Sequence, residues 1–284
     1  MRKSLTLRMF PPEMKTLQRL EIARDAGFEG VEVNLEPWQE YSLASGDDEL
    51  AALRRAVEAR GLCVSTVYSR EQWHYPMSSR DPAVRTHCRD IIAGLARAAT
   101  LLGADTGLVM PGAVDNRILA PQPEIVPYDV AYCNALEVLR ELAHTVCRQH
   151  RVHLAAENCP GKFLMSPLEF ARFLDEIGSP WVGSCFDTGN ALWYGFPEHW
   201  IPVLGTRIRR IHLKDNRVVA LGTLTPTPLL AGDLDWPAIR DALAAIGYDG
   251  WLIAEVFPHY NFHPERLIFE TSAAIDAIFG PAKG

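Results

Sequence analysis

The sequence predicts an α/β fold in the form of a single (β/α)8 barrel, or TIM barrel, over residues 1–284. Short apolar runs alternate with helix-like segments along the whole chain, which is typical of a parallel sheet with right-handed crossovers. Eight such units occur, and eight suit a closed barrel. No linker, low-complexity stretch or block of charge divides the chain. A doubly wound open sheet is the alternative, but no G-x-G-x-x-G motif follows the first expected strand.

The expected strands are short and apolar or β-branched, as strands buried on both faces of a parallel sheet usually are. In chain order they are Ser4–Leu7, Gly30–Asn34, Leu62–Val67, Thr106–Met110, Val152–Glu157, Val182–Asp187, Ile208–His212 and Trp251–Glu255. The expected helices are Glu13–Ala26, Asp48–Arg60, Pro82–Leu102, Val130–His150, Pro167–Ile177, a short one near Pro197–Leu204, Pro237–Ile246 and Pro264–Phe279.

Proline and glycine mark the ends of several expected helices. Proline has no main-chain N–H, but in the first turn of a helix that group would have no partner within the helix, so proline is tolerated there. Glycine just past a helix end adopts the left-handed conformation without strain. The prolines are Pro82, Pro167 and Pro264, and the glycines are Gly27, Gly61, Gly103 and Gly247.

The composition excludes several classes of protein. A net charge of -7 argues against nucleic acid or an anionic membrane as the main partner. No signal peptide and no apolar run of about 18 residues occurs, so we expect a cytoplasmic protein with a small-molecule partner. Homo-oligomerisation is left open. The six cysteines form no C-x-x-C pair, which favours buried reduced thiols over disulfides or zinc knuckles.

Four metal-binding side chains lie at the ends of the last four expected strands. They are Glu157, Asp187, His212 and Glu255. The carboxyl ends of the strands in such a barrel form one rim, where active sites lie. Three carboxylates and an imidazole at one rim would repel one another unless a cation sat among them. The pattern therefore predicts a divalent metal site. A barrel with a vestigial site, serving as a binding module, is disfavoured because all four positions are intact.

The second half of the chain resembles the sugar-phosphate isomerase/epimerase family, the xylose-isomerase-like TIM barrels. Within it, the sequence is most similar to the L-ribulose-5-phosphate 3-epimerase and hexulose-6-phosphate isomerase branch. The order of motifs fits along nearly the whole chain, with a weaker match in the first third. The motifs are Glu157-Asn158, Phe163–Ser166, Ser179–Trp181, Asp187–Asn190, Ile211–Asp215, Asp233–Trp236 and Ile246–Gly250.

The resemblance implies that Glu157, Asp187, His212 and Glu255 bind one divalent ion, with Mn²⁺ expected ahead of Mg²⁺ or Co²⁺. Three oxygen donors and one nitrogen agree with such a cation. The resemblance also implies that Glu157 and Glu255 are catalytic. They would deprotonate and reprotonate a ketose, ketose phosphate or keto-polyol through a metal-bound enediolate. Epimerisation and isomerisation are both compatible with this site. A dehydratase or lyase, acting on an inosose or a 3-keto-glycoside, is the alternative.

Six further residues are candidates for contact with the substrate. Polar ones would bind substrate oxygens, Glu32 could instead orient a metal ligand, and aromatic ones would form a wall of the pocket. For each, an ordinary ion pair or packing contact is the competing interpretation. The candidates are Arg217, Lys214, Asn190, Glu32, Tyr68 and Trp73.

Two segments differ from the phosphosugar relatives that the sequence resembles. Those relatives are arginine-rich in the loop after the third strand, where this chain has Gln72–Pro76. Phosphate recognition favours arginine, so we expect an unphosphorylated substrate, unless Arg70, Arg80 or Arg217 supplies a phosphate site. The proline-rich segment Pro111–Tyr128 is long for a strand–helix connection and is expected to form a lid or an interface.

Overall fold

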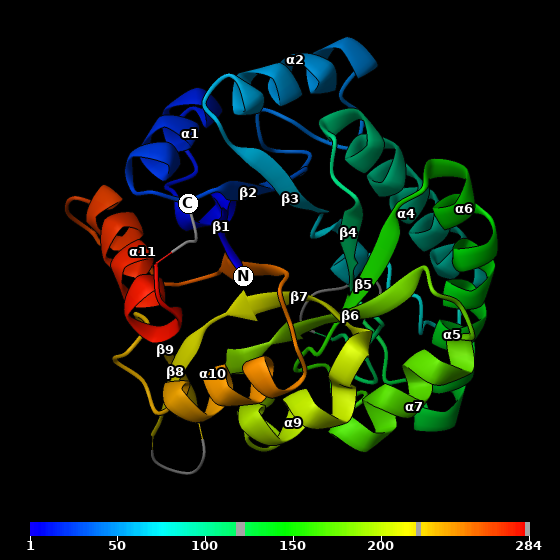
Figure 1. The fold of residues 1–284 in the computed structure, drawn as a ribbon. Coiled ribbons are helices and arrows are strands. Elements are labelled where there is room, and N and C mark those ends of the chain that lie inside the picture. Colours follow the sequence, from blue (N-terminus) through cyan, green and yellow to red (C-terminus); the bar gives the residue numbers. More distant parts are fainter. Residues whose placement is uncertain (118–122, 220–222, 282–284) are drawn as a thin grey trace.

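The computed structural model is a closed barrel of eight parallel strands inside a ring of helices (Figure 1), which confirms the predicted fold class. The structure describes residues 1–117, 123–219 and 223–281. Neighbouring barrel strands follow one another in the chain, and the last strand, β10, closes the barrel against β1. The barrel strands are β1 Arg2–Thr6, β2 Gly30–Asn34, β3 Cys63–Tyr68, β4 Thr106–Val109, β5 His153–Glu157, β6 Val182–Asp187, β7 Ile208–Leu213 and β10 Trp251–Ala254.

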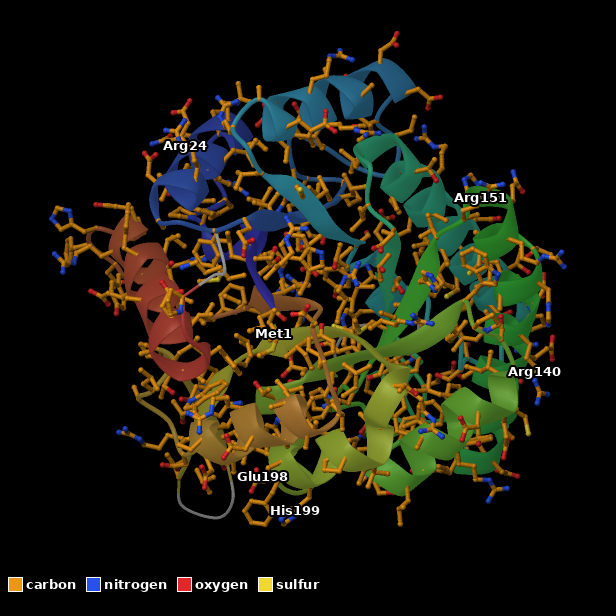
Figure 2. All side chains as sticks on the ribbon, in the orientation of Figure 1. Met1, Arg24, Arg140, Arg151, Glu198 and His199 are labelled. Atoms are coloured by element: carbon orange, nitrogen blue, oxygen red, sulfur yellow. The ribbon has the colours of Figure 1, made fainter. Side chains whose placement is uncertain are left out.

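The main helices lie close to their expected positions. They are α1 Thr16–Asp25, α2 Asp47–Glu58, α4 Pro82–Leu102, α5 Tyr128–His144, α6 Val146–His150, α7 Pro167–Ile177, α9 Pro197–Leu204, α10 Trp236–Ala245 and α11 Glu265–Phe279. Asp81 and Ser166 cap α4 and α7, because their side chains accept main-chain N–H groups of Ala83 and Glu169. Figure 2 shows charged side chains of this ring, such as Arg24 and Arg140, projecting away from the barrel.

Two helix predictions are wrong in detail. The single helix expected over Val130–His150 is interrupted at Thr145, whose φ of -103° and ψ of -83° are not helical. The last helix begins at Glu265, so Pro264 precedes the first turn and does not lie in it. Both differences concern local backbone angles, which an apolar periodicity does not specify.

Several short elements have no counterpart in the sequence prediction, since a periodic pattern needs more residues than they contain. The helices α3 (Glu71–His74) and α8 (Thr188–Ala191) follow β3 and β6 directly. A separate antiparallel hairpin consists of β8 (Asp215–Val218) and β9 (Leu224–Thr227). Short 3-10 turns cover Leu7–Met9 and Gly205–Arg207.

All six cysteines are free. Four of them are buried, whereas Cys63 and Cys133 are exposed, so the expectation of burial is wrong for these two. Of the segment Pro111–Tyr128, residues 118–122 lie outside the described part, and the remainder forms a bridge between Asp115 and Ile125. No helix in the described ranges is long and apolar enough to cross a membrane.

Candidate metal centre and active site

The strand register brings the four predicted ligands to one level at the carboxyl rim of the barrel. Asp187 at the end of β6 is the direct partner of His212 on β7. Glu157 ends β5, and the Glu255 main-chain N–H just past β10 donates to the Leu213 carbonyl of β7. The four side chains are buried, and one ligand atom from each lies within 4.8 Å of the others. Four consecutive barrel strands therefore build one acidic cluster.

Hydrogen bonds fix the orientation of the imidazole and of the central carboxylate. His212 Nε2 lies 3.0 Å from the Glu32 Oε2 atom, and both side chains are 1% exposed. A carboxylate at Nε2 favours a proton on that nitrogen, so Nδ1 is the ring nitrogen that faces the cluster and could bind a metal once it is free of a proton. Asp187 Oδ1 accepts the Asn190 N–H at 2.7 Å, so Oδ2 is the oxygen that faces the cluster. Glu32 thus orients a candidate ligand, the second of the roles considered for it.

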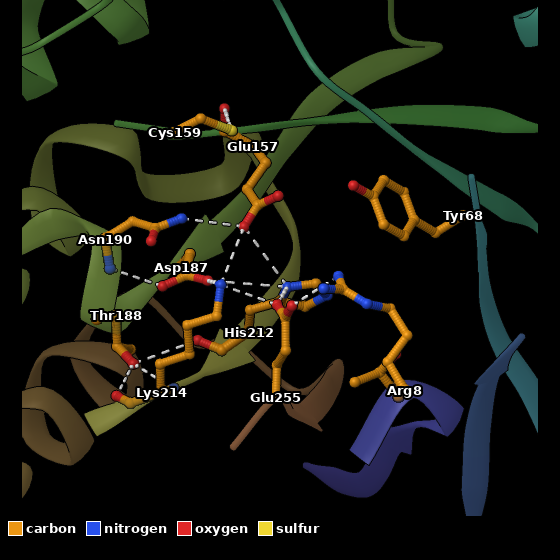
Figure 3. A network of polar contacts seen from close by, with 12 residues as sticks. Arg8, Tyr68, Glu157, Cys159, Asp187, Thr188, Asn190, His212, Lys214 and Glu255 are labelled. Carbon is orange, nitrogen blue, oxygen red and sulfur yellow. Dashed lines mark hydrogen bonds and ion pairs between the residues drawn. The ribbon is translucent and has the colours of Figure 1, made fainter. Parts of the chain in front are cut away.

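Lys214 places its ammonium inside the cluster (Figure 3). Its Nζ atom lies 2.7 Å from Asp187 Oδ2, 3.0 Å from Glu255 Oε2 and 3.8 Å from Glu157 Oε1. Since Lys214 is two residues after His212 on a nearly extended chain, the alternation of side chains points both the same way. In this structure, Lys214 is an ion-pair partner of the candidate ligands, and its contact with a substrate stays a prediction.

The carboxylates of the cluster differ in their proton affinity. Burial raises the pKa of Asp187 to about 7, although the neighbouring Lys214 charge opposes this. Burial also favours the neutral form of Glu157 and Glu255, but Lys214 and His212 hold the pKa of both below the usual range, and that of Glu255 well below it. The buried cluster therefore depends on nearby positive charge to keep its carboxylates ionised.

The pKa values of the imidazole and the ammonium are raised, in contrast to those of the two glutamates. Burial alone would lower the pKa of His212, but Cys185, Glu32 and the cluster carboxylate Glu157 raise it well above its usual value. Burial likewise opposes the charge on Lys214, whereas Asp187 and Glu255 raise its pKa well above the usual value. A metal that binds His212 has to displace a proton from it, so uptake should weaken at low pH.

The net charge of the cluster and two of its buried atoms both fit a divalent cation. Within the described residues, the carboxylates of Glu32 and of the three acidic ligands face two permanent cations, Arg8 and Lys214. With a neutral imidazole, two negative charges remain. Asp187 Oδ2 and His212 Nδ1 are buried and make no hydrogen bond of good angular geometry, although Lys214 Nζ and Glu255 Oε2 lie at ion-pair distance from them. Oxygen and imidazole donors suit Mn²⁺, Mg²⁺, Co²⁺ or Zn²⁺.

A cavity of about 180 Å³ adjoins the cluster. Asn190, Lys214 and Glu255 form its polar side, and Asn190 Nδ2 donates to Glu157 Oε1 at 3.1 Å. Trp193 and Phe257 contribute aromatic surface, and strand β9 of the hairpin covers one side. An apolar wall beside a few polar groups is typical of a small-molecule site.

The sequence prediction missed both aromatic residues of this cavity. Phe257 follows Glu255 by two residues, and the alternation of an extended chain could have indicated it. Trp193 lies just past the unpredicted helix α8, and no pattern in the sequence indicated it.

Of the remaining candidates, Tyr68 lies beside Glu157 (Figure 3), whereas no hydrogen bond within the described residues joins Trp73 or Arg217 to the cluster. The Trp73 indole N–H donates to the Tyr68 hydroxyl at 3.1 Å, and Tyr68 is buried. Arg217 is exposed on the hairpin, where its guanidinium donates to the Ala231 carbonyl. The structure does not bring Arg217 to the ligands.

Within the described residues, the arginines considered for phosphate binding make no hydrogen bond to the cluster. The Arg70 side chain is exposed, while its main-chain N–H donates to Glu36, and the exposed Arg80 forms an ion pair with Glu124. The arginine that does reach the cluster is Arg8, just past β1, whose Nη1 donates to Glu255 Oε1 at 3.0 Å. Arg8 was not among the predicted site residues, although it directly follows the expected strand Ser4–Leu7.

The family model of xylose isomerase-like TIM barrels matches residues 20–278. The chain belongs to this family. This xylose isomerase-like barrel is 27% identical over 278 residues to an Escherichia coli (strain K12) protein provisionally named L-ribulose-5-phosphate 3-epimerase, covering 92% of the chain and 90% of that protein. It is 23% identical over 223 residues to the inosose dehydratase of Geobacillus thermodenitrificans (strain NG80-2), covering 72% of each.

Solved structures share the fold at lower sequence identity. L-ribulose 3-epimerase superposes with a TM-score of 0.80 at 20% identity, over 98% of this chain and 94% of that one. The IolI protein with a bound zinc atom gives 0.81 at 16% identity, over 98% of both chains. These findings confirm the predicted family and barrel.

Proposed function

We propose that this protein is a divalent-metal-dependent epimerase or isomerase acting on a ketose or keto-polyol. The observation that carries the proposal is the buried cluster in which Glu157 and Glu255 flank Asp187 and His212. Their strands, β5 and β10, are separated by β6 and β7, so the two glutamates approach from opposite sides. Such an arrangement offers one carboxylate to each face of a substrate carbon.

The relatives support this choice of reaction. The E. coli relative and a second from Salmonella heidelberg (strain SL476), 24% identical over 87% of this chain and 84% of its own, are named as 3-epimerases of L-ribulose 5-phosphate. Structural neighbours include L-ribulose 3-epimerase and a D-psicose 3-epimerase with D-fructose. Zinc in IolI supports a divalent ion at this rim, and Mn²⁺ is the ion we propose.

The proposed reaction assigns a task to each glutamate. A bound divalent ion would withdraw electrons from the substrate carbonyl and so acidify the neighbouring C–H. One glutamate takes that proton, and the C–H electron pair remains on the substrate as an enediolate. The other glutamate returns a proton to the opposite face, which inverts the carbon. Lys214, 2.7 Å from Asp187, would place positive charge beside the developing oxyanion.

We further propose that the substrate carries no phosphate. The contacts of Arg80 and Arg217 support this, because their guanidinium groups bind Glu124 and the Ala231 carbonyl, and no hydrogen bond within the described part of the chain joins the exposed Arg70 side chain to the cluster. Phosphate dianions favour convergent arginine forks. Steady-state kinetics with matched pairs, each ketose against its phosphate ester, test the point. A higher kcat/KM for the free ketose is expected, and a clear preference for the ester would overturn it.

Dehydration is the second candidate, because an inosose dehydratase aligns over 72% of the chain. It begins with the same deprotonation but expels a hydroxyl group, so the product loses the mass of water. A panel of free ketoses and inososes, incubated with Mn²⁺-loaded protein and followed by NMR and mass spectrometry, separates the reactions. An isomer of equal mass supports epimerisation or isomerisation, and a product lighter by one water supports dehydration.

A further inference from the structure

Arg8 is a half-buried cation that donates a hydrogen bond to one of the two proposed catalytic glutamates. Its side chain is 24% exposed, and its Nη1 atom donates to Glu255 Oε1 at 3.0 Å. Within the described residues, the Arg8 guanidinium makes no other hydrogen bond to a protein group. Arginine keeps its charge at every pH at which the protein folds, so the interaction persists throughout.

The surrounding residues hold Arg8 in place. Its guanidinium carbon lies 5.8 Å from the Tyr68 ring centroid and 5.4 Å from that of Phe257. Tyr68 is held by the Trp73 indole, and the Arg8 carbonyl oxygen lies 2.9 Å from the His259 ring nitrogen Nε2. Contacts from two segments of the rim, the end of β3 and the segment after β10, therefore hold both the main chain and the side chain of Arg8. Two aromatic residues expected to contact the substrate, Tyr68 and Trp73, form part of this support.

The two glutamates differ in how their oxygens are held (Figure 3). Glu255 Oε2 faces the cluster, 2.8 Å from His212 Nδ1 and 3.0 Å from Lys214 Nζ, while Oε1 is bound by Arg8. Glu157 Oε1 also faces the cluster, where the Asn190 amide donates to it. No described residue donates a hydrogen bond to Glu157 Oε2. One glutamate is thus held at both oxygens and the other at only one.

We propose that Arg8 is the positioning residue of Glu255: it fixes the rotation of the carboxylate, so that one oxygen faces the cluster while the other is held by the guanidinium. The inference rests on the proposed function, in which each glutamate serves one face of the substrate. Proton exchange on the Glu255 face then depends on Arg8, whereas exchange on the Glu157 face does not. A charge-assisted hydrogen bond is among the stronger ones in proteins, so its loss should slow the dependent step roughly tenfold or more, which corresponds to about 1.4 kcal/mol.

The kinetic test compares deuterium uptake at C3 from D-fructose and from its 3-epimer D-psicose, in D₂O with Mn²⁺. Arg8→Met should slow uptake from one sugar about tenfold or more and from the other by less than about threefold. The sugar affected should be the one that Glu255→Gln slows most. Arg8→Lys should restore much of the rate, and Arg2→Met, at the far end of β1, should have no effect. Equal slowing of both sugars would overturn the proposal.

If neither sugar reacts, that result counts against the proposed function and not against the positioning role of Arg8. A structural test gives an answer in that case as well. Crystals of the Arg8→Met and Arg8→Lys proteins grown with Mn²⁺ show the Glu255 carboxylate directly. We expect it to rotate or occupy two conformers in the Met variant and to keep its orientation in the Lys variant. An unchanged, single conformer in Arg8→Met would overturn the positioning role.

Discussion

Glu32 should control metal affinity although it does not face the cavity. It binds His212 Nε2 at 3.0 Å, on the side of the ring opposite the cluster, and both side chains are 1% exposed. Replacing Glu32 with Ala removes this acceptor, frees the ring to rotate and leaves a buried N–H without a partner. Replacing it with Gln keeps an acceptor oxygen but removes the negative charge. The alanine variant should therefore be the more severe.

The size of the effect follows from the burial of this pair. Loss of a partner that orients a metal-binding histidine typically lowers affinity about 10- to 100-fold, or about 1.4 to 2.7 kcal/mol. The metal-free alanine variant should also lose about 1 to 3 kcal/mol of unfolding free energy, because the imidazole N–H is left unpaired. In the glutamine variant both losses should be smaller.

Chelator competition measures the Mn²⁺ dissociation constant of each metal-stripped protein, and urea unfolding measures its stability. Glu13→Gln is the matched control, since Glu13 is exposed on the surface. A Glu32→Ala protein that bound Mn²⁺ within about twofold of the native affinity would refute the orienting role.

Three other changes test separate parts of the structure. Glu157→Gln should lose most turnover yet retain more Mn²⁺ than Asp187→Ala, because an amide oxygen can ligate but cannot exchange a proton; native turnover in the glutamine variant would contradict this. Burial raises the pKa of Glu36 to about 7. A raised carboxyl pKa means that stability is greatest below the unfolded value of about 4.5 and falls as the pH rises to about 7. Glu36→Gln should therefore stabilise the protein by up to about 3 kcal/mol at pH 8 and little at pH 5 in urea unfolding, and an equal gain at both would contradict the burial argument. Arg217→Met should leave Mn²⁺ affinity within about twofold by chelator competition, and a larger loss would place Arg217 nearer the ligands than it lies here.

The barrel and its acidic rim could be predicted because strand ends are strongly encoded. Each candidate ligand follows an apolar run, and a parallel barrel places all such ends at one rim whatever the exact register. Proline and glycine at helix ends confirmed the alternation, as at Pro167 and at Gly103, whose φ of 75° is left-handed. These signals are local, and the fold follows from their order.

Contacts that depend on tertiary packing could not be predicted. Arg8 meets Glu255 only because β10 closes the barrel against β1, which brings residues 247 positions apart into contact. Glu32 was recognised as a candidate, but only the structure shows that it meets His212 and not the cavity. The orientation of Lys214 could be predicted from the sequence, because its spacing of two residues from His212 on an extended chain points both side chains the same way.

The most direct test of the proposed chemistry is deuterium uptake at the carbon beside a ketone with and without metal. Metal-stripped protein, confirmed by elemental analysis, is compared with protein loaded with one equivalent of Mn²⁺ on a panel of free ketoses and inososes in D₂O. We expect uptake of one deuterium by at least one substrate, loss of this exchange on chelation and its recovery on adding Mn²⁺. Undiminished exchange by the metal-free protein, or no exchange from any ketone by the loaded protein, would contradict it.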